Sequence, residues 1–148
     1  MKLKVITIVA VVVASLLSAR LFFLGKKSQS NFPELGHSEG KLTPCPDKPN
    51  CVSSQNTAQA TVLPLDGELS LDELKKIVLS MKGAKLEKEG GEYLRFSFKS
   101  DVFGFVDDLE LLKADQLWHI RSSSRVGYSD MNTNRERVEK LRSLTERN

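Results

Sequence analysis

Acidic side chains that could take part in acid–base or metal chemistry gather near one point of the sequence, where Asp107, Asp108 and Glu110 lie within four positions. Carboxylates of this kind, together with a histidine such as His119, can serve as general acids, general bases or metal ligands. Neighbouring side chains of a strand point to opposite faces, so Asp107 would lie on one face and Asp108 with Glu110 on the other. The sequence has no glycine-rich phosphate loop, nucleophile elbow or paired-histidine motif. We therefore expect no metal and no cofactor, and a catalytic role stays open.

Asp107 is in phase with the apolar residues of its segment, since Leu109 lies two positions further on. A carboxylate on the apolar side of a sheet must be paired or neutralised. Arg135 and Arg125 are the predicted partners, Arg135 because its spacing would place it on the inward stripe of the last helix. The alternative is a local bulge that turns the carboxylate outward. If the ion pair forms, Asp107→Ala should lower stability far more than Asp108→Ala.

The segment 121–130 is rich in hydrogen-bond donors and leads directly into the last expected helix. The planar fork of arginine suits carboxylates and phosphates, and the N–H groups at a helix N-terminus attract anions. We therefore predict an anion-binding surface with five candidate residues: Arg121, Ser124, Arg125, Asn134 and Arg135. In the alternative interpretation the serines and Asp130 cap the helix, while the arginines pair internally with Asp107 and Asp130.

The chain has two cysteines, Cys45 and Cys51, and the residues between them include two prolines and an asparagine. Such residues favour a tight turn that could bring the two sulfurs within bonding distance. A structural disulfide is the leading interpretation if the chain is exported. Free thiols and a metal or redox site are the alternatives.

An apolar run covers residues 5–24 and follows the basic residues Lys2 and Lys4. Its 20 residues are about the length that crosses the hydrocarbon core of a bilayer, so the run predicts a transmembrane anchor. A cleaved signal peptide is the alternative, although the obvious cleavage points lack the usual small residues. We divide the chain into an anchor or signal peptide over 1–27, a polar linker over 28–41 and a single domain over 42–148.

Hydrophobic periodicity predicts an α+β domain that consists of one antiparallel sheet of about five strands with both helices on one face. A capping box at Ser70 and Glu73 begins a helix that ends at Gly83, and another at Thr133 and Glu136 begins the last helix. The order of elements is β-α-β-β-β-β-α, and the strands are expected over 61–65, 84–89, 92–99, 102–113 and 116–122.

Charge argues against nucleic acid as a partner. The chain carries 22 basic and 19 acidic residues, but residues 1–30 hold five of the basic ones and no acidic one. The remainder is therefore slightly acidic, without the basic surface that nucleic-acid binding requires.

Three ordered segments carry a family resemblance: residues 45–54 (Cys-Pro-Asp-Lys-Pro-Asn-Cys-Val-Ser-Ser), 105–110 (Phe-Val-Asp-Asp-Leu-Glu) and 121–130 (Arg-Ser-Ser-Ser-Arg-Val-Gly-Tyr-Ser-Asp), the last followed by Asn134-Arg135. They resemble the domain-of-unknown-function family 1499 over roughly residues 42–146. The resemblance implies a mostly bacterial set of exported or membrane-attached proteins, and it implies no activity.

We therefore expect a non-enzymatic domain held by its N-terminus in the bilayer, on the periplasmic side of a bacterial inner membrane. It would bind an envelope protein or a small anionic molecule. One alternative is a hydrolase or transferase that uses Asp107, Asp108 and Glu110 with arginine-assisted anion binding. Another is a purely structural envelope protein.

Overall fold

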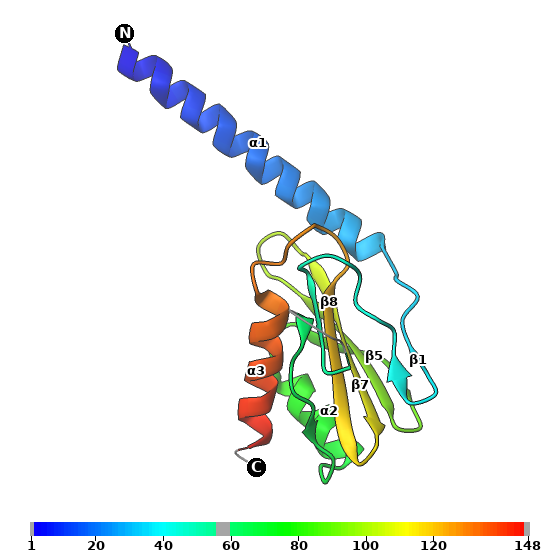
Figure 1. The fold of residues 1–148 in the computed structure, drawn as a ribbon. Helices are drawn as coiled ribbons and strands as arrows, with labels where there is room; N and C mark the ends of the chain where they lie inside the picture. Colours follow the sequence, from blue (N-terminus) through cyan, green and yellow to red (C-terminus); the bar gives the residue numbers. More distant parts are fainter. Residues whose placement is uncertain (1, 56–59, 147–148) are drawn as a thin grey trace.

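The computed structural model describes residues 2–55 and 60–146. Met1 of the expected anchor and residues 56–59 and 147–148 of the expected domain lie outside the described part of the chain. Its first element is the helix α1 (Lys2–Ser30), which projects from an α+β domain (Figure 1). No residue of the apolar run 5–24 of α1 is buried, and the helix is long enough to cross a membrane. A signal sequence has the same length and composition, so the helix is compatible with either role.

The domain is built on a six-stranded antiparallel sheet. Four strands form a meander: β5 (Ala84–Gly90), β6 (Tyr93–Lys99), β7 (Val106–Ala114) and β8 (Leu117–Ser124). Two short strands, β3 (Cys51–Ser53) and β4 (Leu65–Asp66), pair one after the other along the free edge of β8. The expected α+β class and antiparallel sheet are confirmed. Sequence reasoning missed β3, because three residues inside a cysteine motif carry too little periodicity to predict a strand.

Both domain helices lie on the same face of the sheet, as expected (Figure 1). The helix α2 (Leu71–Ser80) begins with the predicted capping box between Ser70 and Glu73, and α3 (Thr133–Thr145) runs beside it. The core between the helices and the sheet includes Leu74, Val78, Leu94, Phe96, Leu109, Leu111, Trp118, Ile120, Val138 and Leu141. Its strand residues are the in-phase apolar positions that the alternation predicts.

The opposite face of the sheet is also covered, which corrects the prediction of a polar linker over 28–41. Residues 28–30 belong to α1, and β1 (His37–Ser38) pairs with β2 (Lys41–Leu42) in a small hairpin. Leu42 packs with Tyr93 and Leu112 in a second apolar cluster, and the His37 ring lies 5.0 Å from that of Tyr93. Residues 31–44, named here the strap, therefore cover part of the sheet face that the helices leave open.

The helix α3 starts at Thr133, as predicted, but its capping differs from the prediction. Asn132 occupies the N-cap in a left-handed conformation and makes no side-chain cap, and the box between Thr133 and Glu136 does not form. Asp130 caps the helix instead: its carboxylate accepts hydrogen bonds from the N–H groups of Asn132 and Asn134 at 3.1 and 2.8 Å. A carboxylate in this position is stabilised by the helix dipole.

Candidate functional site

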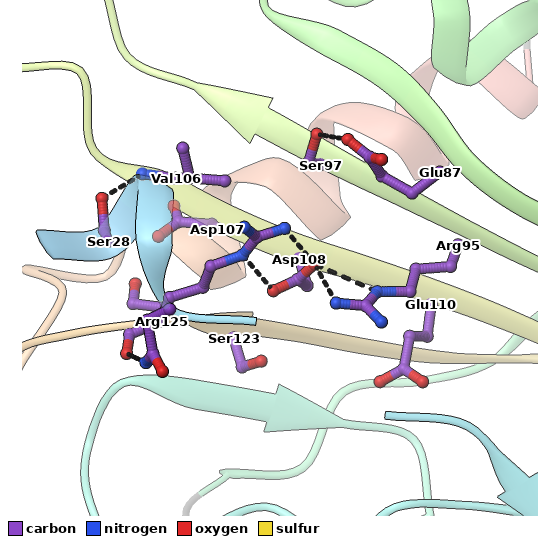
Figure 2. Close-up of polar contacts among 12 residues, drawn as sticks. Ser28, Glu87, Arg95, Ser97, Val106, Asp107, Asp108, Glu110, Ser123 and Arg125 are labelled. Atoms are coloured by element: carbon purple, nitrogen blue, oxygen red, sulfur yellow. Dashed lines mark hydrogen bonds and ion pairs between the residues drawn. The ribbon is translucent and has the colours of Figure 1, made fainter. Parts of the chain in front are cut away.

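The strap face of the sheet carries a buried cluster of charged residues, with Asp108 at its centre. Figure 2 shows the Asp108 carboxylate between the guanidinium groups of Arg95 from β6 and Arg125, the first residue after β8. Arg125 donates two hydrogen bonds, of 2.7 and 2.9 Å, and Arg95 donates two more, of 2.9 and 3.1 Å. The Asp108 side chain is completely buried, so four charge-assisted bonds replace the water that it gave up.

Glu110, two residues further along β7, faces the same side and has its own partners. The Tyr93 hydroxyl donates to one oxygen at 2.7 Å, and the Arg121 guanidinium donates to the other at 3.0 Å. Burial raises the pKa of Glu110, while the tyrosine and the arginine oppose this shift. Burial and the nearby Glu110 carboxylate raise the pKa of Tyr93, which keeps its hydroxyl protonated as a donor.

Asp107 points to the helix face, as expected from its phase, and it is nearly buried. Its predicted partners were wrong: the Arg137 side chain from α3 pairs with it at 2.6 Å, and neither Arg135 nor Arg125 does. The buried stripe of α3 consists of Asn134, Val138 and Leu141, which puts Arg135 one position off it.

The expected order of stability effects is reversed by this geometry. The Asp107 side chain keeps 13% of its surface exposed, whereas that of Asp108 keeps none and is bonded to two arginines. Asp108 is therefore the carboxylate whose removal should cost more.

Asn134 joins the disulfide segment to the helix face of the sheet. Its amide nitrogen donates to the Asn50 carbonyl oxygen at 3.1 Å, and its amide oxygen accepts from Ser122 at 2.7 Å and from Arg137. The Asn50 side chain donates to the Gly127 carbonyl at 2.9 Å. The three sequence segments that carry the family resemblance thus meet around these contacts, the Asp107–Arg137 pair and the cluster around Asp108.

The five predicted anion-binding residues do not come together around one open space. Arg121 and Arg125 bond to the carboxylates described above, and Asn134 is buried within its own contacts. The Ser124 hydroxyl accepts a hydrogen bond from Asn134 at 3.0 Å. Arg135 is half-buried and donates to the Thr61 carbonyl oxygen at 3.0 Å. Asp130 occupies N–H groups of the helix start, as the alternative interpretation expected.

Cys45 and Cys51 form a disulfide, with Cα atoms 5.7 Å apart, which confirms the leading interpretation of the pair. The disulfide loop and the loop after β8 form the two walls of a groove of about 740 Å³. Its lining includes Pro46, Asp47, Lys48 and Pro49 on one wall, and Tyr128, Ser129 and Asp130 on the other. Sequence reasoning did not anticipate this groove, because it depends on how two distant loops meet.

Three buried polar atoms have no hydrogen-bond partner in the described part of the chain: Nε of Arg121, Oδ1 of Asn50 and Nε2 of His119. The other ring nitrogen of His119 lies 3.2 Å from the Ser54 hydroxyl. Burial lowers the pKa of His119. Within residues 2–55 and 60–146, no group of three or more histidine, cysteine, aspartate or glutamate side chains is placed to hold a metal ion.

Fold and site together define the class: a small α+β domain with one disulfide and paired buried charges, carried on an apolar N-terminal helix. The family model described as "Protein of unknown function (DUF1499)" matches residues 41–144, and the chain belongs to this family. The resemblance noted from the sequence is thereby confirmed. Comparisons with curated proteins and with solved structures find no match.

Proposed function

We propose that this protein is a membrane-anchored, extracytoplasmic and non-enzymatic module that binds a segment of another envelope protein. The observation that carries the proposal is the groove between the disulfide loop and the loop after β8.

The groove combines features of a protein-binding surface. Tyr128 is 73% exposed and lies in a lining that also holds the rings of Pro46 and Pro49. Tyrosine is enriched at protein interfaces because it offers a large apolar face and a polar tip. Asp47 and Lys48 add charges of both signs at the same wall, which suits a polypeptide better than a simple anion.

The positions of the carboxylates argue against the hydrolase alternative. Asp107, Asp108 and Glu110 each accept hydrogen bonds from an arginine, and all three are buried. A general acid or base must come within hydrogen-bond reach of a substrate proton. These carboxylates are directed at protein groups on two opposite faces of the sheet, away from the groove lining.

The disulfide supports the proposed location of the domain outside the cytoplasm. Disulfides persist in oxidising surroundings such as the periplasm and are rare in the cytosol. With α1 crossing the inner membrane and its N-terminus inside, the domain would lie outside the cytoplasm, where Cys45 and Cys51 stay oxidised. A phosphatase that works only outside the cytoplasm, fused after Asn148, should be active. An inactive fusion beside an active cytoplasmic reporter would contradict this topology.

Site-specific photocrosslinking in cells tests the groove. A photoreactive residue replaces Tyr128 in the full-length protein, and the matched control replaces Leu63, which is 70% exposed and is not part of the groove lining. The proposal expects one discrete crosslinked protein at position 128 and none at position 63. The captured protein is then purified and its affinity for the intact chain is measured.

Tyr128→Ala should weaken that affinity by about 30-fold, the effect of losing one interface hot spot of about 2 kcal/mol. An unchanged affinity would refute the groove as the binding surface. Titration with phosphate and acetate, followed by NMR, covers the anion alternative: shifts confined to 121–135 would favour a small anionic ligand over a protein.

A further inference from the structure

We propose that the end of the domain next to α1 rests on the bilayer, with the tips of two loops inserted among the lipid headgroups. The loops are 100–105, between β6 and β7, and 125–132, between β8 and α3. In the second loop the lipid-contacting residue is Met131, which is not part of the groove lining that Tyr128, Ser129 and Asp130 provide. The inference rests on the proposed membrane anchoring and adds to it a lipid-contacting surface on the folded domain. The occupant is the same membrane that holds α1.

The distance from the bilayer to the domain is set by α1 itself. The apolar run ends at Leu24, and its 20 residues span about 30 Å as a helix, the thickness of the hydrocarbon core. The next residue, Gly25, already touches the domain: a Cβ atom placed there would lie 1.8 Å from the carbonyl oxygen of Phe103. No spacer therefore separates the membrane-spanning part from loop 100–105.

The helix is also fixed to the domain by hydrogen bonds just beyond this point. The Ser28 hydroxyl accepts from the Val106 N–H at 2.9 Å and is completely buried (Figure 2). The Gln29 side chain donates to the Gly104 carbonyl at 3.0 Å, and that of Asn31 donates to the Arg125 carbonyl at 2.6 Å. These bonds hold both loops against the end of α1, so the helix sets their height relative to the bilayer.

The tips of these loops carry apolar side chains that the protein leaves uncovered. Val102 is 78% exposed and Met131 is 91% exposed. Figure 1 shows both loops at the end of the domain where α1 joins it. An exposed apolar side chain level with the end of a membrane-spanning helix gains by entering the interface. Lys26 and Lys27, exposed on α1 just after the apolar run and Gly25, would meet anionic headgroups at the same level.

The test places tryptophan at the tips and measures quenching by brominated lipid. The native chain has one tryptophan, Trp118, which is 1% exposed and serves as an unchanged internal reference. Full-length Val102→Trp and Met131→Trp are reconstituted into vesicles of phosphatidylglycerol and phosphatidylethanolamine with brominated acyl chains. Leu63→Trp, exposed but joined to the C-terminal half of α3 through Arg142, is the matched control.

The tryptophans at 102 and 131 should lose fluorescence in brominated vesicles relative to unbrominated ones, and the one at 63 should keep it. Quenching at 102 and 131 no stronger than at 63 would overturn the inference, and the domain would then hang free of the bilayer. Flotation of the same vesicles distinguishes a failure of membrane anchoring from a failure of the loop contact alone. Protein that fails to float with the vesicles refutes the anchor and the contact together, whereas protein that floats without quenching refutes the contact alone.

Discussion

The buried cluster around Asp108 makes a quantitative prediction about stability. In Asp108→Ala, the guanidinium groups of Arg95 and Arg125 lose all four hydrogen bonds described above, and both lose their counter-charge. The Arg125 side chain is only 4% exposed, so water cannot replace the lost partner. Breaking a buried pair in this way costs about 3–5 kcal/mol. For a domain of this size the loss corresponds to a fall of roughly 10–20 °C in the unfolding midpoint.

Asp101→Ala is the matched control because Asp101 pairs with Lys82 at the surface, where the two side chains are 63% and 82% exposed. An exposed pair contributes about 0–1 kcal/mol, so this variant should differ from the native protein by no more than a few degrees. Asp108→Asn keeps the shape and one acceptor but removes the charge, and its stability should fall between the other two. That ordering separates the loss of charge from the loss of packing.

Unfolding of the full-length protein in detergent is followed by the fluorescence of Trp118, whose buried ring reports directly on the core. Urea titration gives the free energy of unfolding, and heating gives the midpoint. If Asp108→Ala lowers stability no more than Asp101→Ala does, the buried pairing around Asp108 is wrong, and the strap face is open to water.

Three further predictions concern α1, the disulfide and the half-buried His119. Gly25→Leu should separate α1 from the domain and speed hydrogen exchange at the Val106 N–H, whereas Gly36→Ala, where a Cβ has open space, should leave that exchange unchanged. Cys45→Ser should lower the free energy of unfolding by about 2 kcal/mol in urea, since the disulfide closes a short loop, and reductant should then have no additional effect. Because burial lowers the pKa of His119 in the folded state, the unfolded state binds the proton more tightly, and stability should fall as pH drops through the ordinary value of 6.5. His119→Gln should remove that part of the pH dependence, and an unchanged curve would contradict it.

Local patterns allowed much of the helix face to be predicted. The alternation of Leu94, Phe96 and Phe98 placed these residues inward, and the capping box at Ser70 placed the start of α2. Both signals depend on residues a few positions apart, so the sequence carries them without knowledge of the tertiary fold.

The burial of the strap face could not be predicted in the same way. Its polar alternation in β6 and β7 is typical of a face open to water, yet the face is buried beneath residues that sequence reasoning treated as a linker. The strap covers this face through contacts between residues far apart in the sequence, such as that of His37 with Tyr93. One signal was present: Arg95 and Glu110 occupy paired positions on β6 and β7, and Glu110 is also paired with Arg121 on β8. Opposite charges at facing positions favour pairing between neighbouring strands.

The Asp107–Arg137 pair on the helix face and the cluster around Asp108 on the strap face should behave as separate units, and a double-mutant cycle can show this. Arg137 contacts both Asp107 and Asn134, so removing either partner changes the environment of the other. Residues that share a partner typically couple by about 0.5–3 kcal/mol. Asn134→Ala combined with Asp107→Ala should therefore deviate from additivity within that range.

Asn134→Ala combined with Asp108→Ala should be additive to within about 0.5 kcal/mol, because Asp108 bonds to Arg95 and Arg125 on the other face of the sheet. Urea unfolding of the three single and two double variants measures both cycles. Strong coupling between Asn134 and Asp108 would mean that the clusters form one network across the sheet. The disulfide loop, held by Asn134 through the Asn50 carbonyl, would then be linked to the strap face as well. Additivity would confine the role of Asn134 to the helix face and to the position of the disulfide loop, which forms one wall of the groove.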